Sequence, residues 1–171
     1  MTTTTGTSLD SLWGVLETVL DPEVPVLSVV ELGIVRDVTA DEDGVTVTVT
    51  PTYSGCPAMQ VIERDILDAL AAHGVAGARV RTVYAPAWTT DWMSEEARAK
   101  LKAYGIAPPG VASRTESGSE LVPLRRRRVA PVCPFCDSTD TEPRSDFGST
   151  ACKSLAYCNG CHQPFELFKA I

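Results

Sequence analysis

Two Cys-x-x-Cys pairs in the last third of the chain constrain the fold more than any other sequence feature. Cys133 and Cys136 form the first pair, Cys158 and Cys161 form the second, and 21 residues separate the two pairs. Each pair can present two thiolates on a tight turn, and two such turns complete a tetrahedral four-cysteine zinc site. A segment of about 40 residues has too small a core to fold well alone, so metal binding would supply folding energy. The pattern predicts a zinc ribbon over residues 130–171.

The cysteine spacing leaves two uses of this metal site open. In the first, the metal is a structural zinc. In the second it is functional, as a redox-active iron of the rubredoxin type or as a metal in transit. A site closed by four thiolates has no open coordination position, which favours structural zinc. Cys152 is a surplus cysteine in the same segment. We expect it in the ribbon core, the commoner fate of a free cysteine, or else as a ligand in another arrangement. His162 is expected on the surface of the second turn.

Before the cysteine-rich segment, the hydrophobic pattern predicts helices and strands in the order αββαβα. Helices are expected at 8–20, 57–73 and 94–105, and strands at 33–38, 45–50 and 78–84. Apolar residues three and four apart make 57–73 the most regular helix. Valine and threonine alternate in 45–50, so the valines should face a core and the threonines should face outward or a second layer. This order predicts an α+β fold in which a small three-stranded sheet carries helices on one face.

Composition divides the chain into two domains joined by a linker. Residues 1–105 hold 15 acidic and 7 basic residues, a net charge of −8, whereas residues 106–171 hold 7 acidic and 8 basic residues, a net charge of +1. Residues 106–129 are rich in proline, glycine and serine and lack hydrophobic periodicity. We predict a disordered tail over 1–7, a first domain over 8–105, a linker over 106–129 and the ribbon over 130–171.

The charge and hydropathy of the chain argue against several classes of protein. A net charge of −7 disfavours sequence-independent nucleic-acid binding. No run of apolar residues suits a membrane span, and the N-terminus lacks the features of a signal peptide, so we expect a cytoplasmic protein. The run Arg125–Arg128 is either a solvated part of the linker, which we favour, or a docking site for an acidic partner.

Cys56 is the one cysteine of the first domain, and it precedes the most regular helix. If Pro57 is the first helical residue, Cys56 lies at the helix cap, where the orphan N–H groups stabilise a thiolate. A thiol packed under the turn is equally compatible with this position. The Asp21-Pro22-Glu23 turn places two carboxylates at another helix end. If that turn packs near Cys56, the residues can hold a metal transiently or adjust the thiol.

A thiol hydrolase is disfavoured because Cys56 lacks a convincing general base. His73 lies at the far end of the helix that follows Cys56, about 24 Å away at 1.5 Å per residue. His162 belongs to the other domain. A Cys/His dyad is therefore not expected.

Several motifs together resemble a known family. Asp21-Pro22-Glu23-Val24-Pro25, Leu32-Gly33-Ile34-Val35 and Thr50-Pro51-Thr52-Tyr53-Ser54-Gly55-Cys56-Pro57 resemble the domain of SufT-like iron-sulfur cluster assembly factors. Within that group, the segments 88–93, 105–109 and 147–153 and the ribbon resemble the PaaD (PaaJ) family, accessory subunits of the bacterial phenylacetyl-CoA epoxidase system. The resemblance covers most of the chain outside the tail and the linker.

The resemblance implies a maturation role in aerobic phenylacetate degradation. It makes Cys56 the candidate ligand of an iron-sulfur cluster or iron, with Asp21 and Glu23 shaping its surroundings, and assigns zinc to the four ribbon cysteines. The implied partners are the di-iron oxygenase of the epoxidase or its iron-sulfur reductase. One cysteine cannot enclose a cluster, so a homodimer, a partner or a small thiol must complete the ligands. The alternative is a stoichiometric oxygenase subunit whose ribbon carries redox-active iron for electron transfer. The chain is expected to be an accessory subunit without catalytic activity of its own.

Overall fold

The computed structural model describes residues 8–53, 55–110 and 130–170, and the chain forms two compact units, residues 1–97 and 98–171. The predicted α+β class is confirmed, with a three-stranded sheet in the first unit and a four-cysteine cluster in the second. The predicted tail, most of the linker and the arginine run lie outside the described residues. Among the described helices, none is both long and apolar enough to cross a membrane.

The elements of the first unit follow the predicted order. They are α1 (Leu9–Leu16), β1 (Val35–Asp41), β2 (Gly44–Val49), α2 (Met59–Ala72), β3 (Arg79–Thr82) and the short 3-10 helix η1 (Thr90–Trp92). The sixth predicted element, α3 (Glu95–Tyr104), crosses the boundary between the units. The hydroxyl of Ser8 caps α1 by accepting the N–H of Ser11. The hydroxyl of Ser94 caps α3 by accepting the N–H of Ala97.

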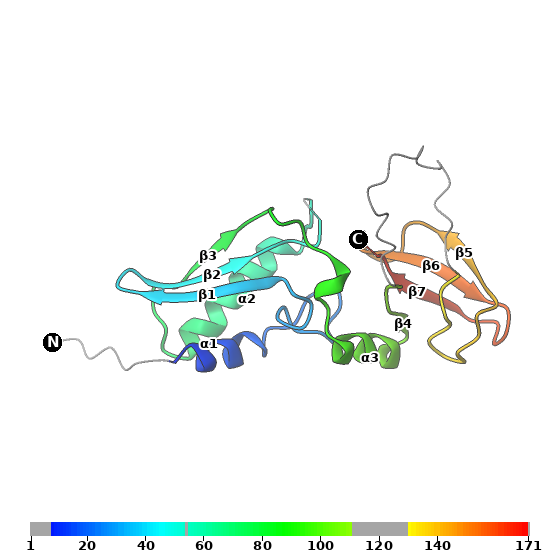
Figure 1. Ribbon diagram of the computed structural model, residues 1–171, viewed down its shortest axis with the longest axis horizontal. Helices are drawn as coiled ribbons and strands as arrows, with labels where there is room; N and C mark the ends of the chain where they lie inside the picture. Colours follow the sequence, from blue (N-terminus) through cyan, green and yellow to red (C-terminus); the bar gives the residue numbers. More distant parts are fainter. Residues whose placement is uncertain (1–7, 54, 111–129, 171) are drawn as a thin grey trace, which may run out of the picture. The chain divides into compact units, whose positions relative to one another are not determined.

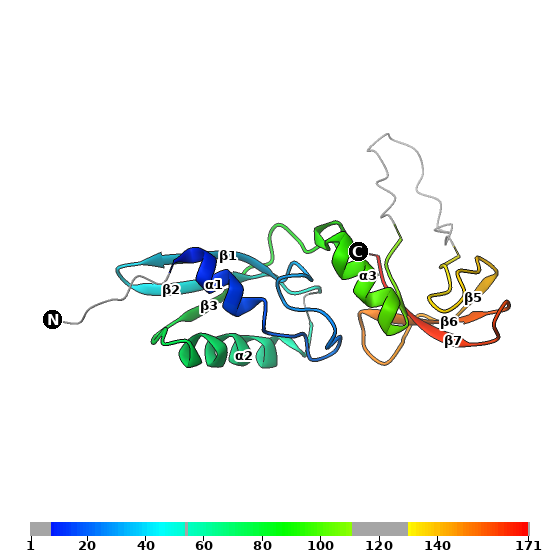
Figure 2. The same cartoon turned by 90° about the horizontal axis from the view of Figure 1, so that it is seen from below.

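The three strands form a sheet in the order β1-β2-β3, with β1 and β2 antiparallel and β2 and β3 parallel. Both α1 and α2 lie on the same face of this sheet (Figures 1 and 2). Val47 and Val49 of β2 are fully buried, as the alternation predicted. Thr48 is buried as well, at 6% exposure, because the Arg81 side chain reaches over it and donates a hydrogen bond to its hydroxyl.

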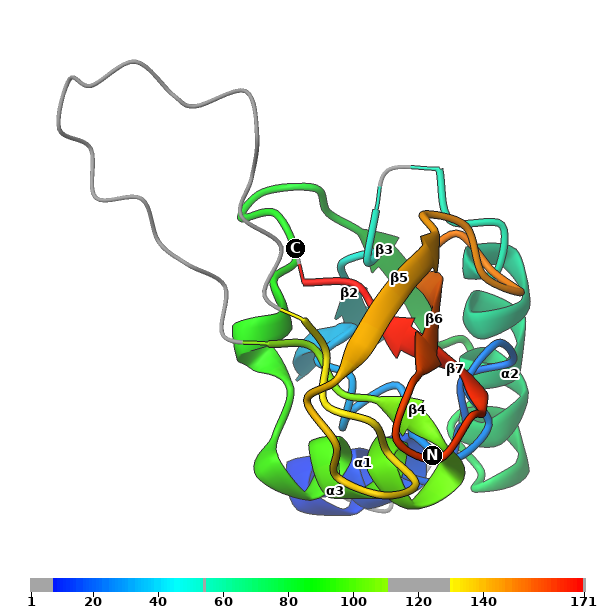
Figure 3. The same cartoon turned by 90° about the vertical axis from the view of Figure 1, so that its right-hand side faces the viewer.

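The ribbon unit has a four-stranded sheet in the order β4-β7-β6-β5. Its strands are β4 (Ile106–Ala107), β5 (Thr141–Ser145), β6 (Lys153–Cys158) and β7 (Pro164–Phe168). The strands β5, β6 and β7 form an antiparallel meander (Figure 3). The sequence analysis placed Ile106 and Ala107 in the linker, whereas the structure pairs them parallel to β7. A two-residue strand has no periodicity of its own, and its partners lie 60 residues away in sequence.

The segment before the linker also contacts the first cysteine turn of the ribbon. Lys102 of α3 forms an ion pair with Asp137. Gly105 has a φ of +92°, and a Cβ added there would lie 3.1 Å from the ring of Phe135. Both the backbone conformation and the close ring therefore require glycine at the end of α3. Ala107 belongs to the same buried cluster as Cys133 and Phe165.

Candidate functional site

The Asp21-Pro22-Glu23 turn is organised by the side chain of Asp21. This carboxylate is buried, at 6% exposure, and its Oδ1 accepts the N–H of Glu23 at 2.8 Å and of Val24 at 2.7 Å. The N–H of Asp21 donates to the carbonyl of Leu27 at 2.9 Å, which closes the loop. Asp21 is thus a turn-forming residue whose charge is held inside the unit. Glu23, half-buried, follows at the surface of this turn.

Cys56 lies in the turn that joins β2 to α2. Its N–H donates to the carbonyl of Tyr53 at 3.1 Å, and its own carbonyl accepts the N–H of Met59 at 3.4 Å. The predicted cap position is wrong: α2 begins at Met59, with Ala58 as the N-cap residue and without a side-chain cap. The bond from Met59 to Cys56 spans three residues, so a turn through Pro57 and Ala58 intervenes before the α-helical pattern starts.

The pKa of the Cys56 thiol is raised, so the thiolate expected at a helix cap is not favoured. Burial of the half-buried thiol is the largest cause. The N–H of Ala58 and the hydroxyl of Thr52 act in the opposite direction, because hydrogen bonds from both stabilise the thiolate. The charges of Glu23 and Asp21 raise the pKa further. The carboxylates of the acidic turn therefore act on the Cys56 sulfur, and burial together with their charge favours the protonated thiol.

Thr50 is a buried polar residue at the start of the Cys56 loop. Only 1% of its surface is exposed, and its hydroxyl has no hydrogen-bond partner in the described parts of the chain. Its N–H donates to the carbonyl of Ile34 at 2.9 Å, which extends the β1–β2 pairing by one bond. A buried hydroxyl without a partner is destabilising, so the stability of the fold does not explain why a threonine occupies this position. In the sequence, Thr50 was only part of the motif of residues 50–57 and had no predicted role.

The segment of residues 88–93 fixes the loop that follows the acidic turn. The indole N–H of Trp88 donates to the carbonyl of Leu32 at 2.9 Å. The next residue, Gly33, has a φ of +69°, and a Cβ there would lie 2.9 Å from the Cβ of Trp92. The guanidinium of Arg36 stacks on the Trp92 ring, 3.4 Å from its centroid. These contacts fix the segment from Leu32 to Arg36.

The four ribbon cysteines form one cluster. The sulfur atoms of Cys133, Cys136, Cys158 and Cys161 all lie within 4.8 Å of one another, with Cys133 and Cys161 at 3.6 Å and Cys136 and Cys158 at 3.5 Å. Four sulfurs at about 2.3 Å from a tetrahedral zinc would be about 3.8 Å apart, so the donors fit that ion. These residues would hold the zinc, which would join the two turns of the ribbon.

Without metal, hydrogen bonds within the cluster give its thiols different acidities. The N–H of Cys161 donates to the sulfur of Cys158 at 3.4 Å, and this bond is the main cause of a Cys158 pKa of about 6. Burial, followed by contacts with the other thiols, raises the pKa of Cys161 to about 12. Cys152 is buried outside the cluster, as expected, with its sulfur 3.1 Å from the Thr150 hydroxyl. His162 is exposed on the second turn, with a φ of +58°.

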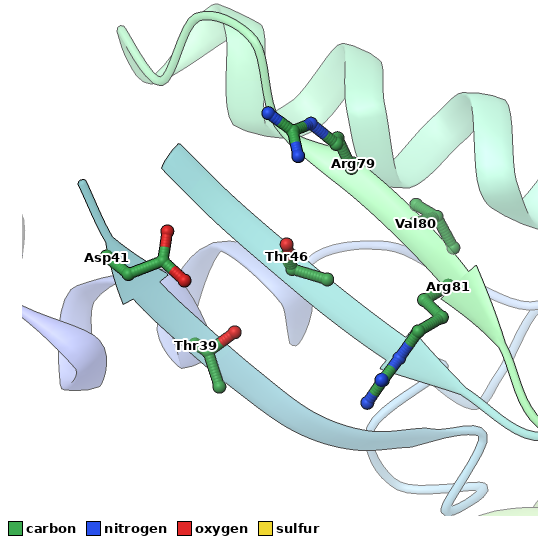
Figure 4. Close-up of a pocket in the computed structure, with 6 residues that line it drawn as sticks. All are labelled: Thr39, Asp41, Thr46, Arg79, Val80 and Arg81. Atoms are coloured by element: carbon green, nitrogen blue, oxygen red, sulfur yellow. The ribbon is translucent and has the colours of Figure 1, made fainter. Parts of the chain in front are cut away.

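A shallow polar depression lies on the sheet face that α1 and α2 leave uncovered (Figure 4). Thr39, Asp41, Thr46, Arg79, Val80 and Arg81 line it. The arginines are already engaged, since Arg79 donates to the carbonyl of Asp43 and Arg81 donates to Thr48. The residues that the sequence analysis selected lie elsewhere, so we do not assign this depression to the site.

An α+β unit with a thiol beside an acidic turn, followed by a four-cysteine ribbon, defines the class: an iron-sulfur assembly domain joined to a zinc ribbon. Family models agree, since residues 9–85 match the iron-sulfur cluster assembly protein family and residues 117–169 match the PaaD zinc beta ribbon domain. An Escherichia coli K12 protein that is named as a subunit of 1,2-phenylacetyl-CoA epoxidase is 43% identical, over 94% of this chain and 92% of that protein. The chain therefore belongs to the PaaD family.

Other relatives match about half of the chain. The Fe-S protein maturation auxiliary factor YitW of Bacillus subtilis is 43% identical over 94 residues, which are 54% of this chain and 91% of that protein. A crystal structure of a DUF59 domain from Bacillus anthracis matches with a TM-score of 0.51 and 37% identity, covering 54% of this chain and 89% of the other. These relatives therefore match about half of this chain over most of their own length.

Proposed function

We propose that this protein is an accessory factor of the phenylacetyl-CoA epoxidase system that helps insert iron or an iron-sulfur cluster into a partner subunit. The E. coli relative is named as a subunit of that epoxidase, and the B. subtilis relative as an Fe-S maturation factor. Together they support a protein that serves the enzyme without carrying out its ring chemistry. In this proposal, the iron or cluster is cargo, and Cys56 is its ligand on this chain.

The observation that carries the proposal is the half-buried Cys56 thiol in the field of Asp21 and Glu23. The carboxylates disfavour a free thiolate, yet the same negative potential attracts a cation. Deprotonation of Cys56 would then accompany metal binding, and the metal would have to displace that proton. The free energy needed to remove that proton lowers the affinity of the site for the metal.

Within this proposal the three residues have different tasks. Asp21 uses Oδ1 to hold the turn, so its contribution is shape and charge. Glu23 is half-buried at the turn and is the carboxylate that would add an oxygen ligand. One thiol and one carboxylate leave coordination positions open. The receiving subunit would fill them, so that the cargo passes from one ligand set to the other.

The ribbon has a structural task in this scheme, with its four thiols closed around zinc. The contrasting role is a redox-active iron in the same four-thiolate site, which would make the chain part of an electron path. Zinc cannot change its redox state, whereas a tetrathiolate iron is coloured and reducible. The identity of the metal that depends on Cys133 separates the two roles.

The test is metal and acid-labile sulfide per chain, measured on protein purified without air, together with the iron content of the epoxidase subunits from the same cells. Cys56→Ser should keep about one zinc, lose iron and sulfide, and leave the partner under-loaded. Cys152→Ser, a buried cysteine outside both sites, is the matched control and should behave as wild type. A fully loaded, active epoxidase from Cys56→Ser cells would refute the proposal. Iron that depends on Cys133, without zinc, would place the chain in electron transfer.

A further inference from the structure

Phe147 is the most exposed large hydrophobic side chain in the described parts of the chain, with 75% of its surface accessible. It lies in the loop of residues 146–152, between β5 and β6. The strand β6 runs from Lys153, beside this loop, to Cys158 in the metal cluster. About 16 Å of extended strand therefore separates the loop from the metal site. Holding the metal does not explain this loop.

Hydrogen bonds from within the loop and its flanks fix its backbone. The N–H of Gly148 donates to the carbonyl of Lys153 at 2.9 Å, and the N–H of Lys153 donates to the carbonyl of Thr150 at 3.1 Å. The N–H of Phe147 donates to the hydroxyl of Ser145 at 3.1 Å. Hydrogen bonds within this chain therefore fix the backbone that carries the exposed ring, without a partner.

Glu166 of β7 fastens the same loop from the sheet. Its Oε1 accepts the N–H of Ser149 at 2.7 Å, and its Oε2 pairs with Lys153 Nζ at 3.1 Å. The Lys153 side chain is only 5% exposed. Burial alone would raise the pKa of Glu166, but the Ser149 and Lys153 donors lower it, so the carboxylate stays charged. Gly148 leaves room for this carboxylate, since a Cβ there would lie 2.9 Å from Oε1.

A largely buried ion pair contributes little net stability, because desolvation offsets the attraction between the charges. In a unit this small, an apolar pair at Lys153 and Glu166 would serve the core at least as well. What the ion pair does define is the path of the loop, since the same carboxylate binds Ser149. The product of this arrangement is a fixed position for Phe147. Single exposed apolar residues are common. This one is carried by a loop that a largely buried ion pair holds in place.

The charges around the ring indicate the kind of partner. Lys169 Nζ lies over the Phe147 ring, 5.2 Å from its centroid, and donates to the carbonyl of Ala151 at 2.8 Å, so a cation is held next to the exposed ring. Asp146 is the neighbouring residue and is exposed. One cation beside an acid does not suit a phosphate backbone or an anionic membrane. A ring in a preset loop with one cation beside it matches the aromatic anchors of protein interfaces.

We propose that Phe147 is the anchor of a protein-docking site on the ribbon, and that it inserts into an apolar pocket on another epoxidase subunit, where a carboxylate at the rim faces Lys169. This inference rests on the proposed function, because it takes the partner from it. It adds a division of labour: the ribbon recognises the partner, and the first unit holds the cargo.

The test is the affinity between the purified full-length chain and the other epoxidase subunits of the same organism, measured for wild type and variants by biolayer interferometry without added iron. Phe147→Ala should weaken the complex about tenfold or more, since the buried ring would be lost. Lys169→Ala should weaken it by a smaller factor and reduce its salt dependence. Tyr104→Ala, which removes an aromatic side chain exposed to 56%, is the matched control and should bind as wild type.

Each variant must retain its zinc and its thermal midpoint, which we expect because Phe147 makes little contact with the core. Cys56→Ser should bind the partner normally, so binding and cargo transfer are tested separately. Unchanged affinity of Phe147→Ala would overturn the docking site while leaving the proposed function standing. Failure of the wild-type chain to bind any epoxidase subunit would overturn the docking site as well. So would a Phe147-dependent interaction with phospholipid vesicles or single-stranded DNA in place of the subunits.

Discussion

At the scale of single residues, the raised pKa of Cys56 governs when its sulfur can react. The thiolate is the form of cysteine that attacks alkylating reagents, and a raised pKa makes the thiolate fraction smaller at every pH below that pKa. We therefore expect iodoacetamide to modify Cys56 more slowly at neutral pH than it modifies a free cysteine in a short peptide. The rate should continue to rise with pH beyond the point at which the peptide levels off. Mass spectrometry of the modified peptide, after timed quenching, measures both.

The electrostatic cause of the raised Cys56 pKa is tested with two charge-removing variants. Glu23→Gln removes a charge that raises the Cys56 pKa, so the pH dependence should shift to lower pH. Glu17 is an exposed acidic residue directly after α1, and Glu17→Gln should leave the pH dependence of Cys56 modification unchanged. A Cys56 that reacts faster than the peptide near neutral pH would contradict the electrostatics described for this site.

Thr50 offers a second test at this scale, because its buried hydroxyl has no described partner. Replacing such a group with an apolar group of the same shape removes an unsatisfied donor and acceptor. Thr50→Val should leave the free energy of unfolding unchanged or raise it by up to about 1 kcal/mol in a urea titration. A loss of more than about 1 kcal/mol would show that the hydroxyl has a partner in the folded protein. If stability rises and epoxidase maturation falls, the hydroxyl serves the site.

At the scale of elements, the fixed loop after the acidic turn depends on a glycine. In Gly33→Ala, the alanine would have to keep a φ of +69°, and its Cβ would lie only 2.9 Å from the Cβ of Trp92. The backbone or Trp92 would therefore have to move, and either movement costs free energy. We expect a loss of about 2–4 kcal/mol of unfolding free energy for the first unit. Gly14→Ala is the matched control, since Gly14 is exposed within α1 with nothing within 4 Å of the new Cβ. That change should stabilise by about 1 kcal/mol. Equal effects of the two substitutions in urea denaturation would contradict this account.

The sequence predicted those elements whose pattern is local. The helix α2 and the hairpin of β1 and β2 follow from periods of 3.6 and 2, and their observed bounds differ from the predicted ones by one to three residues. The strand β4 was missed because Ile106 and Ala107 gain their structure from a distant strand. The position of Cys56 relative to α2 was wrong by two residues, a difference that only the turn through Pro57 and Ala58 decides.

The candidate site shows the same limit. Motifs identified Cys56, Asp21 and Glu23, and in the structure the two carboxylates act on the Cys56 sulfur. The direction in which the Cys56 pKa is shifted could not be predicted, because the shift depends on burial and on charges more than thirty residues away in sequence. The unpaired hydroxyl of Thr50 and the ionic network around Glu166 are likewise properties of packing. A sequence can list such residues, but it does not reveal which of them share an environment.

At the scale of the whole molecule, each of the two units is stabilised by a different kind of core. The first unit has a core of helices packed on a sheet, whereas the core of the ribbon includes two of the four clustered cysteines themselves, Cys133 and Cys158. We therefore expect metal binding to be coupled to the folding of the ribbon and the first unit to be independent of it. This difference makes metal removal a selective perturbation of one unit.

We expect a strong zinc chelator to abolish the hydrogen-exchange protection of β6 and β7 while leaving that of β2 and α2 intact. Protons compete with the metal for the thiolates, so less chelator should be needed as the pH falls and more as it rises. Cys133→Ser should reproduce the effect without chelator, and Cys56→Ser should not. Exchange measured by mass spectrometry resolves the two units in one experiment. If both units lost protection together, metal-linked folding would extend through the whole chain; if neither did, the four thiols would not be what holds the ribbon folded.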